Sequence, residues 1–522
     1  MVKVIEIHDT TCRDGAQSPG CSQSAEDRLT LAIQLAKMGV CTIEAGFPIA
    51  SDVDFAAVRL AAGQVQGARI SALARANEKD IARAAEALQN AIQPGRIHTF
   101  IATSPQHMEF KLKMKPAEVI TRAVEAVKFA CSFAHVGQVQ FSAEDASRSD
   151  IGFLKEIVLA VIEAGAGIIN LPDTVGFAQP QQYGSMFAQI AALREVVEKR
   201  IILSCHCHND LALAVANSLA AVMNGARQAE TTICGIGERA GNTGFEPFVK
   251  ALQLQAEYYR LDCPIDSTQF GPAARLLAAI IKRPIPPTTP VVGGNVFAHS
   301  SGIHQDGMIK HANTYEIMPP QSVGWVGESF PLSTSSGRKG LQTRLDQLGY
   351  QAEGDLLNEV YRLFLQLAET KALVHNADLH MLMQEACVAT SAQSQHLLTV
   401  KRVQYHRLDN VRSVTVLLGR NGFEYEASGS GNGPVSSVWQ AVKTALVRGD
   451  LWPGEVVLED FDVGKSTGGV EALGLAMIKI AHDGQVAFGR GANTDIIEAC
   501  VQAMVAALNH LAHAPIPTVK AE

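Results

Sequence analysis

The sequence predicts a (β/α)8 TIM barrel, followed by a helical linker subdomain and a C-terminal α+β domain with an internal repeat. Through the first half of the chain, short apolar segments alternate with amphipathic helical segments, as in a parallel sheet. Eight such units fit into about 250 residues, which is enough to close a barrel. Two similar units of strands and a helix occur near the C-terminus. We therefore expect domains at residues 1–275, 276–395 and 396–515.

Eight apolar segments that contain many β-branched residues are the expected barrel strands. They span residues 4–7, 41–46, 69–74, 97–102, 139–145, 167–174, 202–208 and 230–238. Between them lie amphipathic segments with helical spacing, such as 24–40 and 209–227. An open doubly wound sheet is the alternative fold. It is disfavoured because no Gly-x-Gly-x-x-Gly run follows the first strand.

The expected strand at 202–208 carries two histidines, His206 and His208. Side chains two residues apart on a strand point to the same face, so both imidazoles project together while Cys205 and Cys207 point the other way. Two neutral imidazoles can bind a divalent cation. A His-x-His pair also occurs as ordinary solvated or hydrogen-bonded histidines, so a metal site needs a further ligand.

Asp14 is the strongest candidate for that ligand, because it lies in a polar stretch directly after the first strand. Its neighbour Arg13 carries a permanent, forked positive charge that suits a developing oxyanion or a carboxylate. A surface turn with an Arg–Asp pair is the plain alternative. In a barrel the carboxyl ends of all strands meet at one face, and polar side chains are expected at nearly every end. These are Asp14, Arg75, His98, Thr103, Glu144, Thr174, His206, His208, Glu238 and Asn242.

Composition limits the class of protein. The net charge is −8 and no run rich in Lys and Arg occurs, so binding to nucleic acid or to a membrane surface is not expected. No apolar stretch is long enough to span a membrane, and the first strand begins almost at Met1 without a signal peptide. The 10 cysteines are scattered with no Cys-x-x-Cys motif, which favours reduced thiols in the cytoplasm.

After the barrel, residues 282–295 are rich in Pro and Gly and are expected to form a linker. A His-rich segment and a helical stretch to about residue 395 follow. Residues 414–442 and 476–504 are then two copies of one unit, each with an Asn-Gly or Asp-Gly hairpin turn, a Gly-rich turn and a helix. The glycines of the Gly-rich turns include Gly431, Gly433, Gly489 and Gly491. Backbone amides at such turns can bind a carboxylate, although the glycines can also serve only to supply a positive φ.

Nine motifs occur in order along the chain: DTTCRDGAQ, EAGFPIAS, HTFIATSP, FSAEDA, LPDTVG, HCHNDLALAVANSLAA, GIGERAGN, HSSGIHQDG and the GNGP of the last domain. On these motifs the chain resembles the 2-isopropylmalate synthase family. That family belongs to the metal-dependent Claisen-condensing barrels, which also include homocitrate and citramalate synthases. The resemblance covers nearly the whole chain.

The resemblance implies a divalent metal, Mn²⁺ first with Mg²⁺ or Zn²⁺ as alternatives, and K⁺ as an activator. It places the metal on Asp14, His206 and His208, with Asn242 as a further, longer ligand. Arg13 would lie on the keto oxygen of the substrate. This ligand set also argues against a non-catalytic amino-acid sensor that keeps the barrel only as a scaffold.

The resemblance also implies roles for other residues at the strand ends. Glu144 and His304 would belong to the acid–base machinery. Thr174 would hold the carboxylate of a 2-oxoacid, and His98 and Ser142 would contact the substrate.

The implied reaction condenses acetyl-CoA with 3-methyl-2-oxobutanoate and water to give 2-isopropylmalate and CoA, the first committed step of leucine biosynthesis. Pyruvate (as for citramalate synthase) and 2-oxoglutarate (as for homocitrate synthase) are the alternative substrates. Leucine would inhibit through the C-terminal repeat. The enzyme would be a homodimer or higher homo-oligomer in which the segment with His304 crosses onto the partner barrel.

Overall fold

The computed structural model describes residues 3–299, 301–326, 332, 336–370, 374, 376–390, 398–408, 411–451, 455–465, 474–483 and 485–513. The chain divides into two compact units. One contains residues 1–297 and 316–327, and the other contains residues 298–315 and 328–522. The domain boundaries expected from the sequence remain a prediction.

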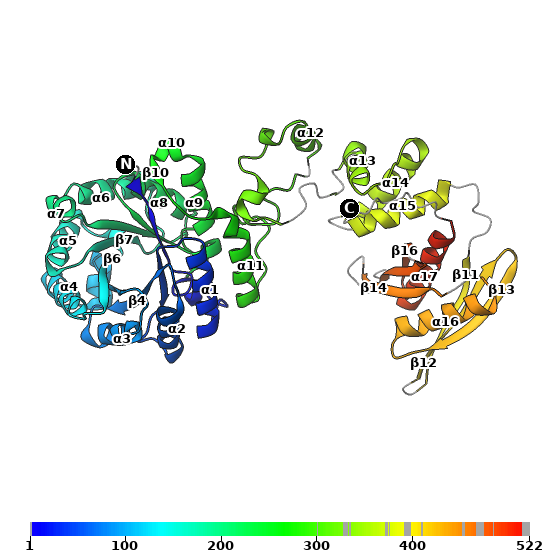
Figure 1. The fold of residues 1–522 in the computed structure, drawn as a ribbon, viewed down its shortest axis with the longest axis horizontal. Coiled ribbons are helices and arrows are strands. Elements are labelled where there is room, and N and C mark those ends of the chain that lie inside the picture. The colour runs from blue at the N-terminus through cyan, green and yellow to red at the C-terminus, as the bar shows by residue number, and fades with distance from the viewer. Residues whose placement is uncertain are drawn as a thin grey trace. The chain divides into compact units, whose positions relative to one another are not determined.

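The first unit is built on a closed barrel of parallel strands, as the sequence predicts (Figure 1). Its strands are β2 (Glu6–Asp9), β3 (Thr42–Gly46), β4 (Arg69–Arg75), β5 (Gly95–Ala102), β6 (Val136–Glu144), β7 (Ile168–Asp173), β8 (Ile202–Cys207) and β9 (Gln228–Thr231). Strand β9 also pairs with β2, which closes the barrel. The short strands β1 (Lys3–Val4) and β10 (Leu261–Asp262) pair outside it.

The last barrel strand is shorter than predicted. The sequence suggests a strand over residues 230–238, but β9 ends at Thr231 and the chain then turns through a 3-10 helix, η4 (Ile233–Gly235). Cys234 has a φ of 55° within this turn, a left-handed conformation outside the β region of a regular strand. The rest of the predicted strand is therefore a loop at the carboxyl end of the barrel.

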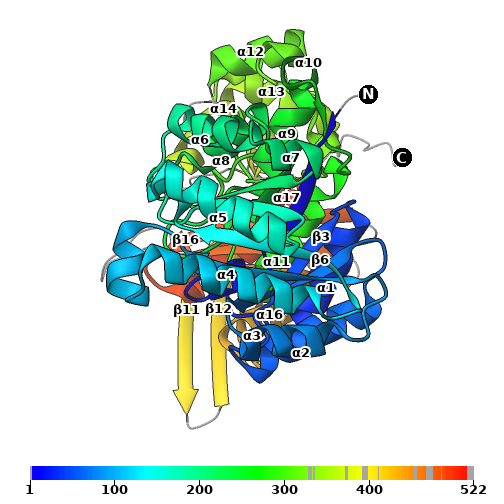
Figure 2. The ribbon, with the colours of Figure 1, turned by 90° about the vertical axis from the view of Figure 1, so that its left-hand side faces the viewer.

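Helices surround the barrel on the outside (Figure 2). They are α1 (Ala25–Lys37), α2 (Asp52–Gln64), α3 (Glu78–Leu88), α4 (Pro116–Cys131), α5 (Ile151–Ala164), α6 (Pro180–Ala191), α7 (Arg194–Glu198), α8 (Ala214–Met223), α9 (Phe245–Leu254), α10 (Ala256–Tyr259) and α11 (Phe270–Ile281). Local sequence fixes several starts, since Ser24, Ser51, Asn77 and Asp150 each accept a backbone N–H bond at a helix N-terminus. The apolar faces of these helices pack on the strands and form one continuous core.

The interior of the barrel is polar below its open end. Arg96, on β5, is fully buried there and donates hydrogen bonds to Gln138, Gln140 and Gln228. A buried guanidinium is stable only when its donors are satisfied, and here amide oxygens satisfy them. The barrel interior thus contains a layer of hydrogen-bonded polar side chains.

The second unit begins with helices and ends with the predicted repeat. Its helices are α12 (Gly302–Lys310), α13 (Arg338–Gln347), α14 (Gly354–Thr370) and α15 (Asn376–Thr390). The first copy of the repeat is the antiparallel sheet β11 (Thr399–Leu408), β12 (Val411–Arg420) and β13 (Phe423–Ser430) with α16 (Pro434–Arg448). The second is β14 (Val457–Lys465), β15 (Gly474–His482) and β16 (Gln485–Asn493) with α17 (Ile496–His513). The two copies share one apolar core, which confirms the repeat.

The prediction of a Gly-rich turn in the second copy is wrong. Gly489 and Gly491 lie inside strand β16, and a Cβ atom on either would come within 2.0 Å of a backbone oxygen of α17. These glycines therefore allow the helix to pack closely on the strand. In the first copy, Gly431 and Gly433 do lie between β13 and α16 as expected. The second of the two predicted hairpin turns contains Gly484, which lies outside the described residues.

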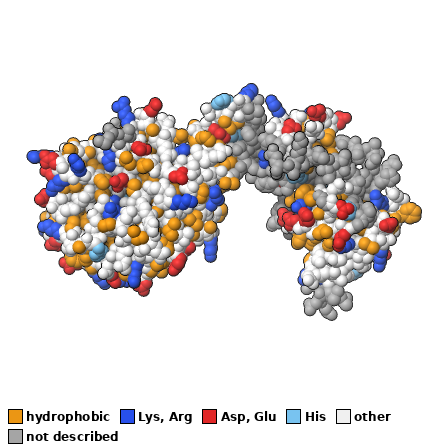
Figure 3. Space-filling model, viewed as in Figure 1, with side chains coloured by type: hydrophobic (Ala, Val, Ile, Leu, Met, Phe, Trp, Pro, Cys, Tyr) orange, Lys and Arg blue, Asp and Glu red, His pale blue; other side chains and the backbone are white. Residues whose placement is uncertain are grey.

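Among the described residues, no helix has the length and apolar character needed to cross a membrane. The ten cysteines are free thiols. On the face of the barrel seen in Figure 3, Lys and Arg side chains are interspersed with Asp and Glu.

Candidate active site

A cavity of about 210 Å³ opens at the carboxyl ends of the barrel strands. Its polar lining contains most of the side chains predicted to lie at the strand ends, and its apolar lining comes from side chains on several strands and loops. The lining residues are Arg13, Asp14, Gln17, Phe47, Leu73, His98, Phe100, Ser142, Glu144, Asn170, Pro172, Thr174, His206, His208, Glu230 and Glu238.

Asp14, His206 and His208 lie together in this cavity. One ligand atom from each lies within 4.8 Å of the others, and all three residues are buried. His206 lies on β8, and His208 is the first residue after this strand. The centroids of the two imidazole rings are 5.0 Å apart. Cys205 and Cys207 point to the other side of the strand and are buried in the core. A carboxylate and two imidazoles converging in this way are suited to a divalent metal.

The amide of Asn242 completes this group. Its Nδ2 donates to Asp14 Oδ1 at 2.9 Å, which fixes the orientation of the carboxylate. Its Oδ1 is buried without a hydrogen-bond partner among the described residues. An unsatisfied buried oxygen is costly unless something binds it, so the donor set fits a bound cation. Within the part of the chain that the structure describes, His208 Nδ1 is also buried without a hydrogen-bond partner.

The protonation states of Asp14 and His208 favour metal binding. Burial alone would raise the pKa of Asp14, but the Arg13 guanidinium and the two histidines lower it below its usual value. Burial, aided by the charge of His206, lowers the pKa of His208 to about 4. Burial opposes a proton on His206 as well, yet the contact with Glu230 raises its pKa. Near neutral pH the group therefore offers an ionised carboxylate and a neutral His208.

Arg13 is held by two carboxylates. Its Nε donates to Glu44 Oε2 at 2.5 Å, and its Nη1 donates to Asp14 Oδ2 at 2.7 Å. Glu44 Oε1 lies 2.6 Å from His98 Nδ1, and His98 Nε2 lies 2.6 Å from the hydroxyl of Ser142. These contacts form one buried chain that fixes the direction of the guanidinium at the cavity wall.

Glu144 and Thr174 lie at the ends of β6 and β7. Glu144 Oε1 accepts a hydrogen bond from Lys111 Nζ at 2.6 Å, and Lys111 belongs to a π-helix, η2 (His107–Leu112). The hydroxyl of Thr174 accepts from the backbone N–H of Asp145 at 3.0 Å. The hydroxyl proton of Thr174 is therefore available to an acceptor in the cavity.

The other selected residues are less closely associated with the cavity. Glu238 lines its edge, whereas Arg75 is paired with Asp80 and Thr103 bonds to Ser149. His304 belongs to α12 in the second unit, where it is exposed and stacks on Tyr315 with centroids 4.2 Å apart.

Two further residues of the site, Glu44 and Glu230, were not predicted from the sequence. Both are fully buried carboxylates on barrel strands that contact site residues. A signal was present in each case, because an acidic residue within an otherwise apolar strand needs a buried partner. The sequence could not show that these positions face the barrel interior.

Two further buried carboxyls hold the loops that carry the site. Asp9 Oδ1 accepts from the backbone N–H of Thr11, before Arg13 and Asp14. Glu246 accepts from the backbone N–H of Cys234, at the start of the loop that leads to Asn242. Burial raises the pKa of each carboxyl to about 7.

Three family models match the chain. They are HMGL-like over residues 4–277, homocitrate synthase post-HMGL domain-like over residues 291–372, and the LeuA allosteric (dimerisation) domain over residues 373–512. A 2-isopropylmalate synthase from Nitrosospira multiformis is 44% identical over 508 residues, which cover 97% of each chain. Another, from Heliobacterium modesticaldum, is 43% identical over 523 residues, covering 100% of this chain and 99% of that protein.

We predict that Glu246→Gln changes how stability depends on pH. Burial raises the pKa of Glu246 from 4.5 to about 7, so the folded protein holds this proton more tightly than the unfolded chain does. Wild-type stability should therefore fall as pH rises from 4.5 to about 7, by at most about 3 kcal/mol from this group. In calorimetry, the unfolding temperature of the variant relative to wild type should rise through that window and level off above it. If the unfolding temperatures of wild type and variant change with pH in parallel across this window, then Glu246 is ionised in the folded protein.

Proposed function

The chain belongs to the 2-isopropylmalate synthases within the HMGL-like family, and we propose that it carries out the reaction of that family in the cavity at the end of its barrel. It is an acyltransferase of leucine biosynthesis with 2-isopropylmalate synthase activity. Identity of 44% across 97% of both chains is the observation that carries this conclusion. The reaction condenses acetyl-CoA with 3-methyl-2-oxobutanoate and water to give 2-isopropylmalate and CoA.

We propose that Asp14, His206 and His208 hold a divalent metal, with the amide oxygen of Asn242 as a further ligand. Mn²⁺ is our first choice because the donors are nitrogen and oxygen atoms, with Mg²⁺ or Zn²⁺ as alternatives and K⁺ as an activator. When bound, the metal supplies Lewis-acid polarisation of the ketone and orients the 2-oxoacid. The unpartnered Asn242 Oδ1 supports this assignment.

Arg13 and Thr174 would bind the oxygens of the 2-oxoacid. Arg13 is fixed by Glu44 and Asp14, so its positive charge is already in place where the keto oxygen becomes an alkoxide. Thr174 can donate its hydroxyl proton to the substrate carboxylate, because the hydroxyl oxygen already accepts a bond from Asp145. His98 and Ser142 form the adjacent wall of the cavity.

Glu144 would act on the methyl group of acetyl-CoA, directly or with His304. It lines the cavity and its Oε1 lies 2.6 Å from Lys111 Nζ, which holds the carboxylate in position. His304 would assist from a partner subunit. The LeuA allosteric (dimerisation) domain supports a homodimer under allosteric regulation. A cytoplasmic location remains our prediction, in keeping with the ten free thiols.

The cavity lining favours a 2-oxoacid with one carboxylate and an apolar side chain. Phe47, Leu73, Phe100 and Pro172 give it an apolar wall. Among the lining residues that the structure describes, Arg13 is the single guanidinium or ammonium group, and two carboxylates already pair with it. A second substrate carboxylate, as in 2-oxoglutarate, would meet no further cation among these lining residues.

We expect His208→Ala to abolish turnover and to weaken metal binding, since it removes a nitrogen donor from the buried group. Release of free CoA should be followed with 3-methyl-2-oxobutanoate, pyruvate and 2-oxoglutarate as alternative substrates, and 3-methyl-2-oxobutanoate should give the highest kcat/KM. Asp80→Asn is the matched control, because Asp80 is a buried barrel residue outside the cavity. Full activity of chelator-treated His208→Ala protein would contradict the metal assignment.

Mixed dimers test the role of His304. If the segment with His304 completes the site of the partner, then mixing His304→Ala chains with Glu144→Ala chains should restore activity, because one of the two sites in a mixed dimer is intact. Restored activity should approach about one quarter of wild type with random exchange, since half of the dimers are mixed and each has one intact site. No recovery after verified subunit exchange would place His304 and Glu144 in one chain.

We also propose that leucine is the ligand of the C-terminal repeat. Gly431 and Gly433 precede α16, where free backbone N–H groups can receive a carboxylate. In the second copy Asp495 already accepts from the backbone N–H of Ile497 at the start of α17, so Gly489 and Gly491 would contribute only through packing.

A leucine titration should therefore inhibit the full-length enzyme but not a version truncated near residue 395. Coupling between regulatory and active sites is typically about 1–3 kcal/mol, so we expect roughly 5- to 150-fold inhibition. The measurements are leucine binding by calorimetry and CoA release by both proteins. If leucine neither binds to nor inhibits the full-length enzyme, the repeat serves assembly alone.

A further inference from the structure

The hydrogen bonds beneath the proposed metal centre have a fixed direction, and we propose that this direction sets the tautomer of His206 so that its Nε2 is free to bind metal. We call the four residues involved, Arg96, Gln140, Glu230 and His206, the polarity relay. The inference rests on the proposed metal centre, and it makes Glu230 and Gln140 positioning residues for the reaction.

The relay begins at Arg96 in the barrel interior. Its Nη1 donates to Gln140 Oε1 at 3.0 Å, and Gln228 Nε2 donates to the same oxygen at 3.1 Å. A guanidinium can only donate hydrogen bonds. Gln140 must therefore present its oxygen toward Arg96, which leaves its NH₂ group facing the opposite way.

Gln140 then acts as a donor to Glu230. The distance from Gln140 Nε2 to Glu230 Oε1 is 2.6 Å, and both side chains are buried. The side chain of Glu230 is only 1% exposed, so its partners are protein groups and not bulk water. A carboxylate can accept from Gln140 through one oxygen and from a second donor through the other.

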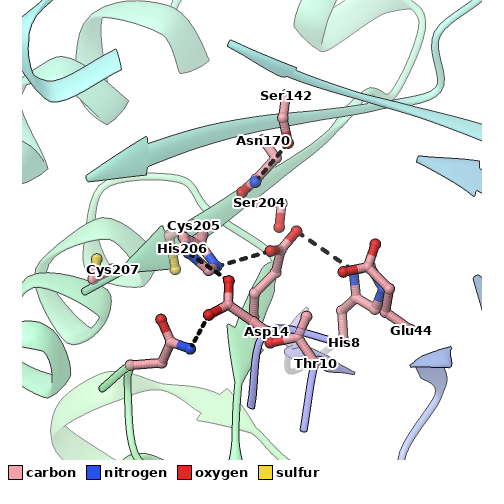
Figure 4. Close-up of polar contacts among 12 residues, drawn as sticks. His8, Thr10, Asp14, Glu44, Ser142, Asn170, Ser204, Cys205, His206 and Cys207 are labelled. Atoms are coloured by element: carbon pink, nitrogen blue, oxygen red, sulfur yellow. Dashed lines mark hydrogen bonds and ion pairs between the residues drawn. The ribbon is translucent and has the colours of Figure 1, made fainter. Parts of the chain in front are cut away.

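The second oxygen of Glu230 meets His206. Glu230 Oε2 lies 3.0 Å from His206 Nδ1. On the other side of the ring, His206 Nε2 lies 3.8 Å from Asp14 Oδ2 (Figure 4). A neutral imidazole beside this carboxylate keeps its proton on Nδ1. The lone pair of Nε2 then faces Asp14, as a metal ligand requires. His208 has no such partner, since its Nδ1 is without a hydrogen bond among the described residues.

The relay predicts that Glu230→Gln is disruptive although the two side chains have the same shape. Gln140 can offer only N–H to residue 230, so the new amide must place its oxygen toward Gln140. Its NH₂ group then faces His206 Nδ1, which must accept, and the ring proton moves to Nε2. His206 in that tautomer cannot bind a metal through Nε2.

Exchanging the side chains of Gln140 and Glu230 restores the direction of the hydrogen bonds in the relay. In the double variant Gln140→Glu, Glu230→Gln, a carboxylate at 140 accepts from Arg96 and from the NH₂ group of residue 230. The oxygen of residue 230 then faces His206 Nδ1, and the original tautomer returns. Side-chain composition and net charge are the same as in wild type.

Mn²⁺ binding to the chelator-stripped, full-length protein tests this, with free Mn²⁺ measured by electron paramagnetic resonance. Glu230→Gln should bind Mn²⁺ roughly 10- to 100-fold more weakly than wild type, and the double variant should recover most of that loss. Asp80→Asn, which removes a buried carboxylate away from the relay, should bind as wild type does.

A second measurement reads the tautomer in the wild-type protein and needs a relay substitution only to assign the signal. Histidine labelled with ¹⁵N, assigned with a His206→Asn protein, reports the tautomer of metal-free wild type at a pH where the ring is neutral. A proton on Nδ1 is expected, and a proton on Nε2 would overturn the relay. Wild-type Mn²⁺ affinity in Glu230→Gln, or no recovery in a folded double variant, would overturn it too. If wild type binds no metal ion, including Mg²⁺ and Zn²⁺, the metal centre itself is wrong.

Discussion

The pairing of buried charges determines the geometry of the site. Removing a charged group from water costs several kcal/mol unless a partner of opposite charge or a set of hydrogen bonds replaces the water. Arg13 meets this requirement through Asp14 and Glu44, and His206 meets it through Glu230. Each partner also orients the group it stabilises. The groups proposed to act on substrate are consequently rigid before any ligand arrives, which is a condition for electrostatic catalysis.

The barrel makes this pairing possible because neighbouring strands bring distant parts of the chain into register. His98 lies opposite Gln140 on the adjacent strand, and Gln228 lies opposite both Glu6 and Ser204. The inward side chains therefore form layers, with apolar residues between the strands and the outer helices. In the closed barrel, inward side chains such as Arg96, Gln140 and Gln228 satisfy one another's hydrogen bonds where water does not reach them.

Sequence alone predicted the features that have a regular period or a sharp boundary. The strand pattern predicted the barrel, the spacing of two predicted a common face for His206 and His208, and the polar stretch after the first strand predicted Asp14. It missed Glu44 and Glu230 because inward and outward positions of a fully buried strand look alike in sequence. It misplaced Gly489 and Gly491 because a glycine in a turn and a glycine under a helix give the same signal.

The two copies of the C-terminal repeat are unequal, and this inequality bears on regulation. The N-terminus of α16 follows Gly433, where added side-chain atoms would meet nothing, whereas that of α17 is already capped by Asp495. The second sheet also packs on the helical part of the unit: Phe488 stacks on His380 of α15, and His380 bonds to Tyr350. Met477, on β15, packs against the same helical core. The carboxylate of the proposed ligand would therefore meet the N-terminus of α16 in the first copy, whereas the second copy makes the contacts that reach α15. The core that the two copies share would connect such binding to the rest of the unit.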